Sequence, residues 1–268
     1  MIVPCHHIQC RKIGNPLLQK KLPTQMHSTA RLSVNLNKVA LSRNSRGSNL
    51  PNLVQVALDC EKFGAEGITV HPRPDQRHIR FDDIEPLKTA IATELNIEGN
   101  PTQEFMDLVL QHKPAQCTLV PDTPSQLTSD SGWDTVKQQA MLTDIIQILH
   151  DHSIRVSVFV DPVKEMVIGA KKAGADRIEL YTGVYAARYH ENSEKAIRPF
   201  IDAARVANEV EIGVNAGHDL NLQNLRFFAQ SIPNLLEVSI GHALISDALY
   251  YGLGNIIPIY RHLLRVEP

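Results

Sequence analysis

The stretch GITVHPRPDQRHIR, residues Gly67–Arg80, joins a short apolar run to a dense group of ionisable side chains. The residues Ile68, Thr69 and Val70 are β-prone and predict a buried strand. The group that follows consists of His71, Arg73, Arg77, His78 and Arg80. Such a loop is either a solvated basic segment or a site that binds an anion and moves protons. Guanidinium groups pair with phosphate, and imidazole titrates near neutral pH.

Polar side chains also follow the other short apolar runs of the chain. They are Asn35, Asn37, Lys38, Glu98, Asp161, Glu179, Thr182, His218, Asp219 and His242. Taken singly, several have a purely structural explanation. We expect Arg43 and Arg46 to be solvated loop charges, and Asp161, which precedes a proline, to be a helix N-cap. We expect Glu179 to point into the protein and pair with a Lys or Arg, as a buried carboxylate requires.

Acid–base groups recur at these strand ends more often than structural roles explain. His71, Glu98, His218 and His242 each follow a different strand. The first three form a candidate proton-transfer set, since imidazole titrates near neutrality and burial raises the pKa of a carboxylate toward it. No Ser-His-Asp order is present, and Lys38 is a weak candidate for a Schiff base. Among these strand-end histidines, no H-x-H or H-E-x-x-H spacing supports a metal site.

Two groups of residues could bind anions. Gly241-His242 opens a helix, whose free N–H groups and positive end could receive a phosphate together with the loop Ala216-Gly217. The second group is Arg73 and Arg77 with His78, because guanidinium suits bidentate phosphate contacts. Two anion sites imply either a bisphosphate or two phosphorylated substrates.

The elements that position these groups alternate regularly from Arg31 onward. KFGAEGITVH and KAGADRIELY are near copies in which a helix ends at a left-handed Gly and a strand follows. Strands are predicted at Leu32–Asn37, Gly67–His71, Glu94–Glu98, Gln116–Val120, Arg155–Val160, Arg177–Tyr181, Glu211–Asn215 and Leu236–Ile240. Helices are predicted at Leu53–Phe63, Thr102–Gln111, Val136–His152, Val163–Lys172 and Ser193–Asn208. Eight such units predict a (β/α)₈ barrel, whose active site lies at the C-terminal strand ends. An open doubly wound sheet is the alternative, but no G-x-G-x-x-G follows the first strand.

Composition narrows the class of protein. The chain has 268 residues, 43% hydrophobic and 21% charged, with a formal net charge of −2 that gives no reason to expect nucleic acid or a membrane as partner. Its 4 cysteines show no disulfide-framework spacing, which favours a reducing compartment such as the cytoplasm. No apolar stretch approaches the ~20 residues that cross a bilayer.

The first 30 residues differ from the rest. Residues 1–30 lack acidic side chains, and we expect a dispensable leader, with residues 31–268 forming the barrel domain. An organelle transit peptide, or a true start at Met26, are the alternatives. The Cys5, His6, His7 and Cys10 quartet lacks the remaining ligand turns of a zinc site.

The motifs in order resemble the pyridoxine 5′-phosphate synthase family, from about Arg31 to Arg265. The pieces that match are VNLNKVALSRNSRG, GAEGITVHPRPDQRHI, NIEG, CTLVPD, IELYTG, VNAGHDL and IGHALI. The resemblance implies a barrel with a few extra short helices, assembled as an octamer that is a tetramer of dimers. It also implies a transferase that condenses 1-deoxy-D-xylulose 5-phosphate with 3-amino-2-oxopropyl phosphate, without an obligatory cofactor or metal. The products would be pyridoxine 5′-phosphate, phosphate and water.

The resemblance also implies roles for individual residues. Glu98 and His71 would accept protons, and His218 would donate one. Contacts to the aminoketone phosphate would come from Asn35, Arg46, Gly241 and His242. Contacts to the pentulose phosphate would come from Arg73, His78 and Thr128.

Asn37, Lys38 and Asp219 are also expected substrate contacts, although they lie at two positions that depart from the family pattern. Asn37-Lys38 stands where the family commonly has Asp-His beside the pentulose site, and Asp219 stands where Gly is common. Asn37 cannot act as a base, and a carboxylate at 219 would repel a phosphate unless it turns away. A phosphosugar aldolase using Lys38, a metal-dependent hydrolase, and a non-catalytic phosphate-binding barrel remain the alternatives.

Overall fold

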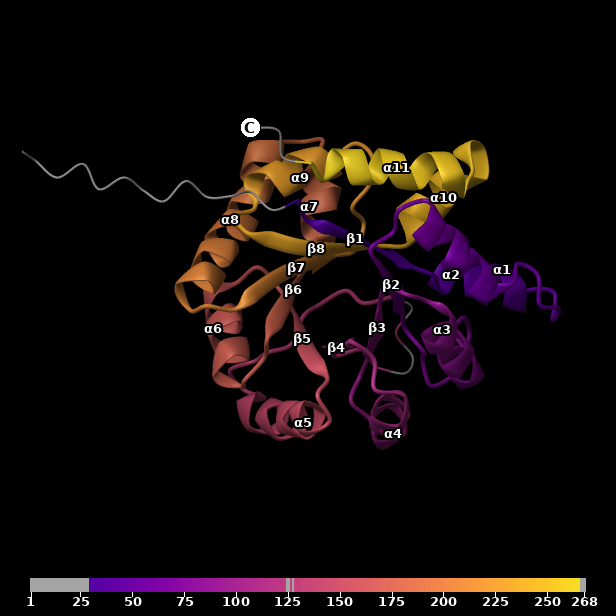
Figure 1. Cartoon of the computed structure of the whole chain (residues 1–268). Coiled ribbons are helices and arrows are strands. Elements are labelled where there is room, and N and C mark those ends of the chain that lie inside the picture. Colours follow the sequence, from indigo (N-terminus) through magenta and orange to yellow (C-terminus); the bar gives the residue numbers. More distant parts are fainter. Residues whose placement is uncertain (1–28, 124–125, 127, 266–268) are drawn as a thin grey trace, which may run out of the picture.

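The computed structural model describes residues 29–123, 126 and 128–265, and these form a closed barrel of parallel strands. The strands follow one another around the barrel in chain order, as Figure 1 shows. They are β1 (Arg31–Asn35), β2 (Gly67–Val70), β3 (Glu94–Gly99), β4 (Gln116–Leu119), β5 (Arg155–Val160), β6 (Arg177–Tyr181), β7 (Gly213–Gly217) and β8 (Leu235–Ile240). Because β8 pairs with β1, the sheet has no free edge, and the predicted (β/α)₈ barrel is confirmed.

Helices surround the barrel on its outside (Figure 1). They are α1 (Asn37–Asn44), α2 (Leu53–Lys62), α3 (Ile84–Ala90), α4 (Gln103–His112), α5 (Gln139–Asp151), α6 (Lys164–Lys172), α7 (Gly183–Arg188), α8 (Ser193–Glu209), α9 (Leu225–Ser231), α10 (His242–Tyr251) and α11 (Leu253–Leu263), with a 3₁₀ turn, η1 (Phe81–Asp83). The helix pairs α1/α2, α7/α8 and α10/α11 each follow a single strand, so one helix of each pair is additional to the eight-fold repeat. The extra short helices that the resemblance implied are therefore present.

Several boundaries differ from the prediction for local reasons. The first strand ends at Asn35 rather than Asn37, because the Asn35 side chain accepts the Asn37 N–H at 3.0 Å and turns the chain into α1. The seventh strand runs over Gly213–Gly217, so Ala216 and Gly217 belong to the strand and not to the loop after it. Helix α5 begins at Gln139 rather than Val136.

The barrel interior is filled largely by polar side chains. The odd positions of β1 and β2 point inward, where Ser33 Oγ lies 2.7 Å from Thr69 Oγ1. Thr118 of β4 donates to Asn96 of β3 at 3.0 Å. The aliphatic residues between them face the helices and form the main core. The polar filling replaces the branched aliphatic layers common in such barrels.

Charged side chains close the N-terminal end of the barrel. Glu94 accepts hydrogen bonds from Arg31 at 3.1 Å and from Arg155 at 2.5 Å, and Glu237 lies 3.3 Å from Arg31. Burial alone would raise the pKa of Glu94, but the hydrogen bonds from these two arginines outweigh it and lower the pKa to about 2. The stabilising ion pairs therefore lie at the N-terminal end of the barrel, and the predicted acid–base residues lie at the C-terminal end.

The two near-copy segments adopt the predicted left-handed turn. Gly64 and Gly174 have φ angles of +108° and +97°, and each is followed within three residues by a strand. Side chains other than Gly rarely adopt such angles, so these glycines allow helix to return to strand in a short turn.

The predicted leader lies almost wholly outside the described residues, as does the Cys5–Cys10 segment. Ala30, which we expected to belong to the leader, is 4% exposed and packs in the core. In the part of the chain that the structure describes, no helix is long and apolar enough to cross a membrane.

Candidate active site

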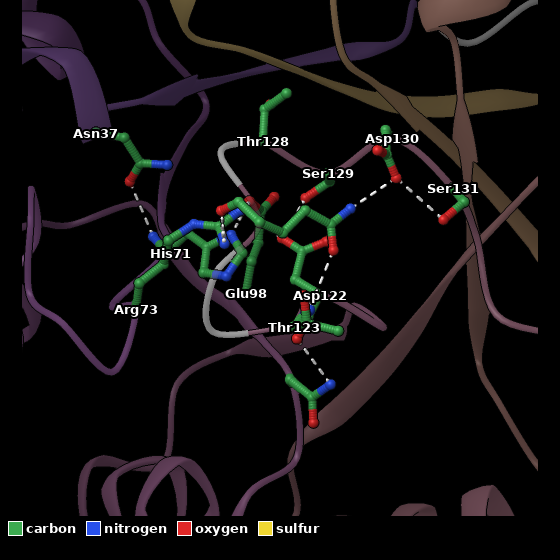
Figure 2. Close-up of polar contacts among 12 residues, drawn as sticks. Asn37, His71, Arg73, Glu98, Asp122, Thr123, Thr128, Ser129, Asp130 and Ser131 are labelled. Atoms are coloured by element: carbon green, nitrogen blue, oxygen red, sulfur yellow. Dashed lines mark hydrogen bonds and ion pairs between the residues drawn. The ribbon is translucent and has the colours of Figure 1, made fainter.

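His71 and Glu98 meet at the C-terminal mouth of the barrel. His71 directly follows β2, and Glu98 is an inward residue near the end of β3, so neighbouring strands bring them together. His71 Nδ1 lies 4.0 Å from Glu98 Oε2, and Asn35 Nδ2 lies 3.5 Å from the same oxygen. The Asn37 side chain accepts the His71 backbone N–H at 3.0 Å, which ties the start of α1 to the end of β2 (Figure 2).

Both members of this pair are driven toward their neutral forms. Burial lowers the pKa of His71 well below its ordinary value, and the charges of Arg73, His78 and Arg77 lower it further. Burial raises the pKa of Glu98 well above its ordinary value, assisted by the Glu179 and Asp122 carboxylates. The 4.0 Å separation satisfies an ion-pair distance, yet it is too long for a hydrogen bond, and both pKa directions oppose charge separation. We therefore describe a neutral pair that can exchange protons with a substrate.

Glu179 is a second member of the cluster of buried carboxyl side chains that includes Glu98. It lies on β6, is 4% exposed, and accepts a hydrogen bond from Thr118 at 3.5 Å. We expected a Lys or Arg partner, but no ion pair of Glu179 occurs within the described residues. Instead, burial and the nearby Glu237 raise its pKa to about 8. Protonation of the carboxyl, rather than a salt bridge, makes its burial tolerable.

His218 lies on the far side of the mouth, directly after β7. Its Nε2 is 2.9 Å from Thr128 Oγ1, and its ring packs edge-on against Tyr181 of β6 at 5.1 Å. The carboxylate of Asp219 lies 2.9 Å from His218 Nδ1, so it turns toward the imidazole. The structure thus brings the predicted donor together with Thr128, a residue we predicted to bind phosphate.

Three described residues that follow β4, Asp122, Gln126 and Ser129, form a hydrogen-bonded cluster with Arg73 beside the site. Asp122 Oδ2 accepts hydrogen bonds from Arg73 at 2.5 Å and from Ser129 at 2.6 Å (Figure 2). Arg73 also donates to the Gln126 carbonyl at 3.0 Å. Arg73 is only 4% exposed, so a phosphate would meet this guanidinium while it is bonded to Asp122.

The imidazole of His78, the second histidine of the stretch Gly67–Arg80, is uncharged. His78 Nδ1 accepts the Ile79 backbone N–H at 3.0 Å, and its ring lies 6.4 Å from that of His71. Burial, followed by the charges of Arg73 and Arg77, lowers the pKa of His78 to about 4. Its remaining ring nitrogen, Nε2, is thus suited to a neutral hydrogen bond with a ligand.

Arg43 is not the solvated charge that we expected. It is 3% exposed and binds Asp83 at 2.6 and 2.9 Å and the His78 carbonyl at 3.3 Å. Asn44 donates to the same His78 carbonyl at 2.7 Å. These contacts hold the segment after His71 in place, so Arg43 supports the predicted phosphate contacts without entering the mouth.

The residues predicted to hold the aminoketone phosphate come from the two strands that close the barrel. Gly241, the residue before α10, approaches Asn35 so closely that a Cβ on it would lie 3.1 Å from the Asn35 Cβ. His242 begins α10 and is exposed, as are Arg46 and Lys38 near α1. The structure therefore joins Asn35 to Gly241 and leaves the side chains of Lys38, Arg46 and His242 exposed at the surface.

One further prediction was wrong. Asp161 is no N-cap, because α6 begins at Lys164 with Val163 before it. The Asp161 carboxylate instead accepts the Gly132 N–H at 3.3 Å. Sequence reasoning also missed the contacts of Asp122, Ser129 and Tyr181, since only the motif LVPD pointed toward the first of them.

The fold is that of a (β/α)₈-barrel enzyme, and the C-terminal mouth of its barrel brings together buried acid–base side chains. Residues 32–266 match the family model described as "Pyridoxal phosphate biosynthesis protein PdxJ". This chain belongs to that family, as the motifs predicted.

Relatives and solved structures agree with this placement. The pyridoxine 5′-phosphate synthases of Cytophaga hutchinsonii and Flavobacterium johnsoniae are 59% and 56% identical over 235 residues, covering 88% of this chain and 99% of theirs. The pyridoxine 5′-phosphate synthase of Bacteroides fragilis is 58% identical over 235 residues, with the same coverage of both chains. A 3-keto-L-gulonate-6-phosphate decarboxylase from Vibrio cholerae covers 88% of this chain and 98% of its own with a TM-score of 0.60 at 7% identity, which shows the common fold alone.

Proposed function

We propose that this chain is a pyridoxine 5′-phosphate synthase. It condenses 1-deoxy-D-xylulose 5-phosphate with 3-amino-2-oxopropyl phosphate to pyridoxine 5′-phosphate, phosphate and water. The observation that carries the proposal is the neutral His71–Glu98 pair facing His218 from the opposite side of one barrel mouth. The relatives' shared synthase name supports the same reaction.

The reaction consists largely of proton transfers. Imine formation between the amine and the ketone, loss of phosphate, ring closure and aromatisation each move protons to or from carbon, nitrogen or oxygen. Glu98 is the neutral acid in the resting site and accepts a proton only after it has given its own away; burial and its carboxylate neighbours then make the ionised form a strong base. His71, neutral beside it, is the second acceptor, and His218 donates a proton to a leaving oxygen.

The two phosphates occupy separate parts of the mouth. The pentulose phosphate binds Arg73, His78 and Thr128, beside Asn37 and Lys38 on α1. The aminoketone phosphate binds Asn35, Arg46, Gly241 and His242, where the first N–H groups of the ten-residue helix α10 are directed toward it.

A coupled incubation tests this proposal. Purified, chelator-treated protein is mixed with both substrates, and phosphate release and pyridoxine 5′-phosphate formation are followed together. Both products are expected. Phosphate without the ring product would favour a lyase or hydrolase, and neither product from folded protein would favour a binding protein. Borohydride trapping at Lys38 would support the aldolase alternative.

Glu98→Gln tests the assigned base. The substitution removes the carboxylate and keeps its volume, so turnover is expected to fall by about 10²- to 10⁴-fold. Glu191→Gln, at an exposed glutamate after α7, is the matched control and should leave turnover unchanged. Near-normal turnover in Glu98→Gln would refute the assignment.

The assembly and location are part of the proposal. We place the enzyme in the cytoplasm as an octamer that is a tetramer of dimers. The exposed apolar side chains of α10 support association, since Leu249 and Tyr250 are 83% and 87% exposed. Sedimentation equilibrium of the wild type and of Leu249→Asp tests this: a monomeric wild type would refute it, and dissociation of the variant alone would assign α10 to the contact.

A further inference from the structure

Both ring nitrogens of His218 have partners. Nδ1 lies 2.9 Å from Asp219 Oδ2, and Nε2 lies 2.9 Å from Thr128 Oγ1. The hydrogen bond from His218 lowers the pKa of Asp219, so its carboxylate is ionised and can only accept. Nδ1 therefore carries a hydrogen, and Nε2 is the nitrogen that faces Thr128 and the mouth of the barrel.

The backbone holds these two side chains toward each other. His218 and Asp219 have φ angles of +90° and +58°, which are uncommon for residues with a Cβ. Thr182 donates to the carbonyls of Gly217 and His218 and thereby fixes the start of this turn. Asn224 donates to the Asp219 carbonyl at 3.3 Å and fixes its end. A segment constrained at both ends presents the carboxylate to the imidazole.

Other titratable groups surround the pair without bonding to the ring nitrogens. Tyr181 contacts the ring from β6, and its pKa is raised by burial and by the carboxylates of Asp219, Asp130 and Asp161. His242, on α10, also lowers the pKa of Asp219 through its electrostatic interaction with the carboxylate. Among the described residues, Asp219 is the carboxylate that hydrogen-bonds to His218.

We propose that Asp219 is a positioning residue for His218, which holds the ring as the Nδ1–H tautomer and stabilises its imidazolium form. This role deepens the proposed synthase reaction and rests on it. It replaces the expectation that Asp219 is a substrate contact, because the carboxylate is directed at the imidazole rather than at the predicted phosphate residues.

The proton balance of the step is simple. In the imidazolium both ring nitrogens carry hydrogen. The Nε2–H bond breaks, the proton passes to the leaving oxygen of the substrate, and the electron pair stays on Nε2. The neutral ring keeps its Nδ1–H bonded to Asp219, which remains ionised throughout. The next proton taken up at Nε2 restores the donor.

Asp219→Gly and Asp219→Asn test the role. Gly accepts the positive φ angle without strain, so the fold should be retained. Asn keeps the volume but can present an N–H to Nδ1, which would favour the other tautomer. We expect kcat to fall about 10- to 100-fold in both, below the 10²–10⁴ of a whole general acid, with KM changed less than about threefold. Asp130→Asn removes a charge at the same mouth without touching His218 and serves as the control.

A second readout does not depend on turnover. Solid-state ¹⁵N spectra of histidine-labelled protein report the tautomer of His218, whose signal is assigned by its loss in His218→Gln. A protonated Nδ1 is expected in the wild type and a shifted equilibrium in Asp219→Asn. An unchanged tautomer in Asp219→Asn would overturn the proposal. Variants that keep the full kcat and show a lower KM for a phosphorylated substrate would overturn it as well. If the wild type forms no pyridoxine 5′-phosphate, the synthase assignment fails, and the spectra still decide the His218–Asp219 contact.

Discussion

Glu179→Gln should stabilise the folded protein in a manner that depends on pH. The native carboxyl has a pKa of about 8 against an ordinary value of 4.5, because it is buried beside other carboxylates. Between these two values the native state binds more protons than the unfolded state, so wild-type stability falls as pH rises. Gln reproduces the neutral carboxyl and does not titrate.

The size of the effect follows from linkage. Each pH unit above 4.5 costs the wild type about 1.4 kcal/mol until the native group itself ionises near pH 8. The difference in unfolding free energy between Glu179→Gln and wild type should therefore grow by about 3 kcal/mol from pH 4.5 to pH 7. Above pH 8 the difference should level off.

Urea denaturation at fixed protein concentration checks this at several pH values. Glu191→Gln, which is exposed, is the control and should show no comparable trend. A difference that stays constant from pH 4.5 to pH 8 would show that Glu179 titrates normally and would refute the account of a neutral carboxyl group in the barrel.

Three further substitutions test the supporting structure. Arg43→Ala should destabilise the fold by about 3 kcal/mol in thermal or urea melts, because it removes a buried guanidinium and leaves the partly buried Asp83 carboxylate, whose side chain is 14% exposed, without its cationic partner; a loss below about 1 kcal/mol would contradict this. Gly132→Ala should cost about 1–3 kcal/mol, since its Cβ would lie 2.4 Å from the Asp161 backbone nitrogen, whereas Gly47→Ala meets no atom within 4 Å and should cost about 1 kcal/mol from its positive φ alone; equal losses would refute the steric reason. Glu94→Gln should lose about 1–3 kcal/mol at pH 7, a deficit that shrinks as pH falls from 4.5 toward 2 because the wild-type carboxylate is then protonated; a deficit independent of pH would exclude the arginine pairs as its cause.

Much of the fold could be predicted because each unit carries local signals. The left-handed glycines at 64 and 174 mark the helix-to-strand turns, and apolar runs mark the strands that follow. Parallel strands in chain order then place every strand end on one rim. His71, Glu98 and His218 could be grouped for that reason alone, before any contact was known.

The remaining contacts depend on tertiary placement that spacing does not report. Arg73 and Asp122 are separated by 49 positions, and Arg43 and Asp83 by 40, so neither pair has a sequence signature. Asp161 preceded a proline, as N-caps often do, but the helix starts later and the carboxylate binds a loop amide instead. Local patterns predict which residues reach the rim, whereas loop packing decides what each one touches there.

The bond between Arg73 and Asp122 has a consequence for which anions the enzyme admits. The carboxylate is part of the chain, so it competes for the guanidinium at an effective concentration that no dissolved chloride or acetate approaches. A singly charged anion gains little by replacing it, while a phosphate dianion brings a second charge and a third oxygen. At the proposed pentulose-phosphate site, this buried pair therefore favours a phosphate dianion over abundant monovalent anions.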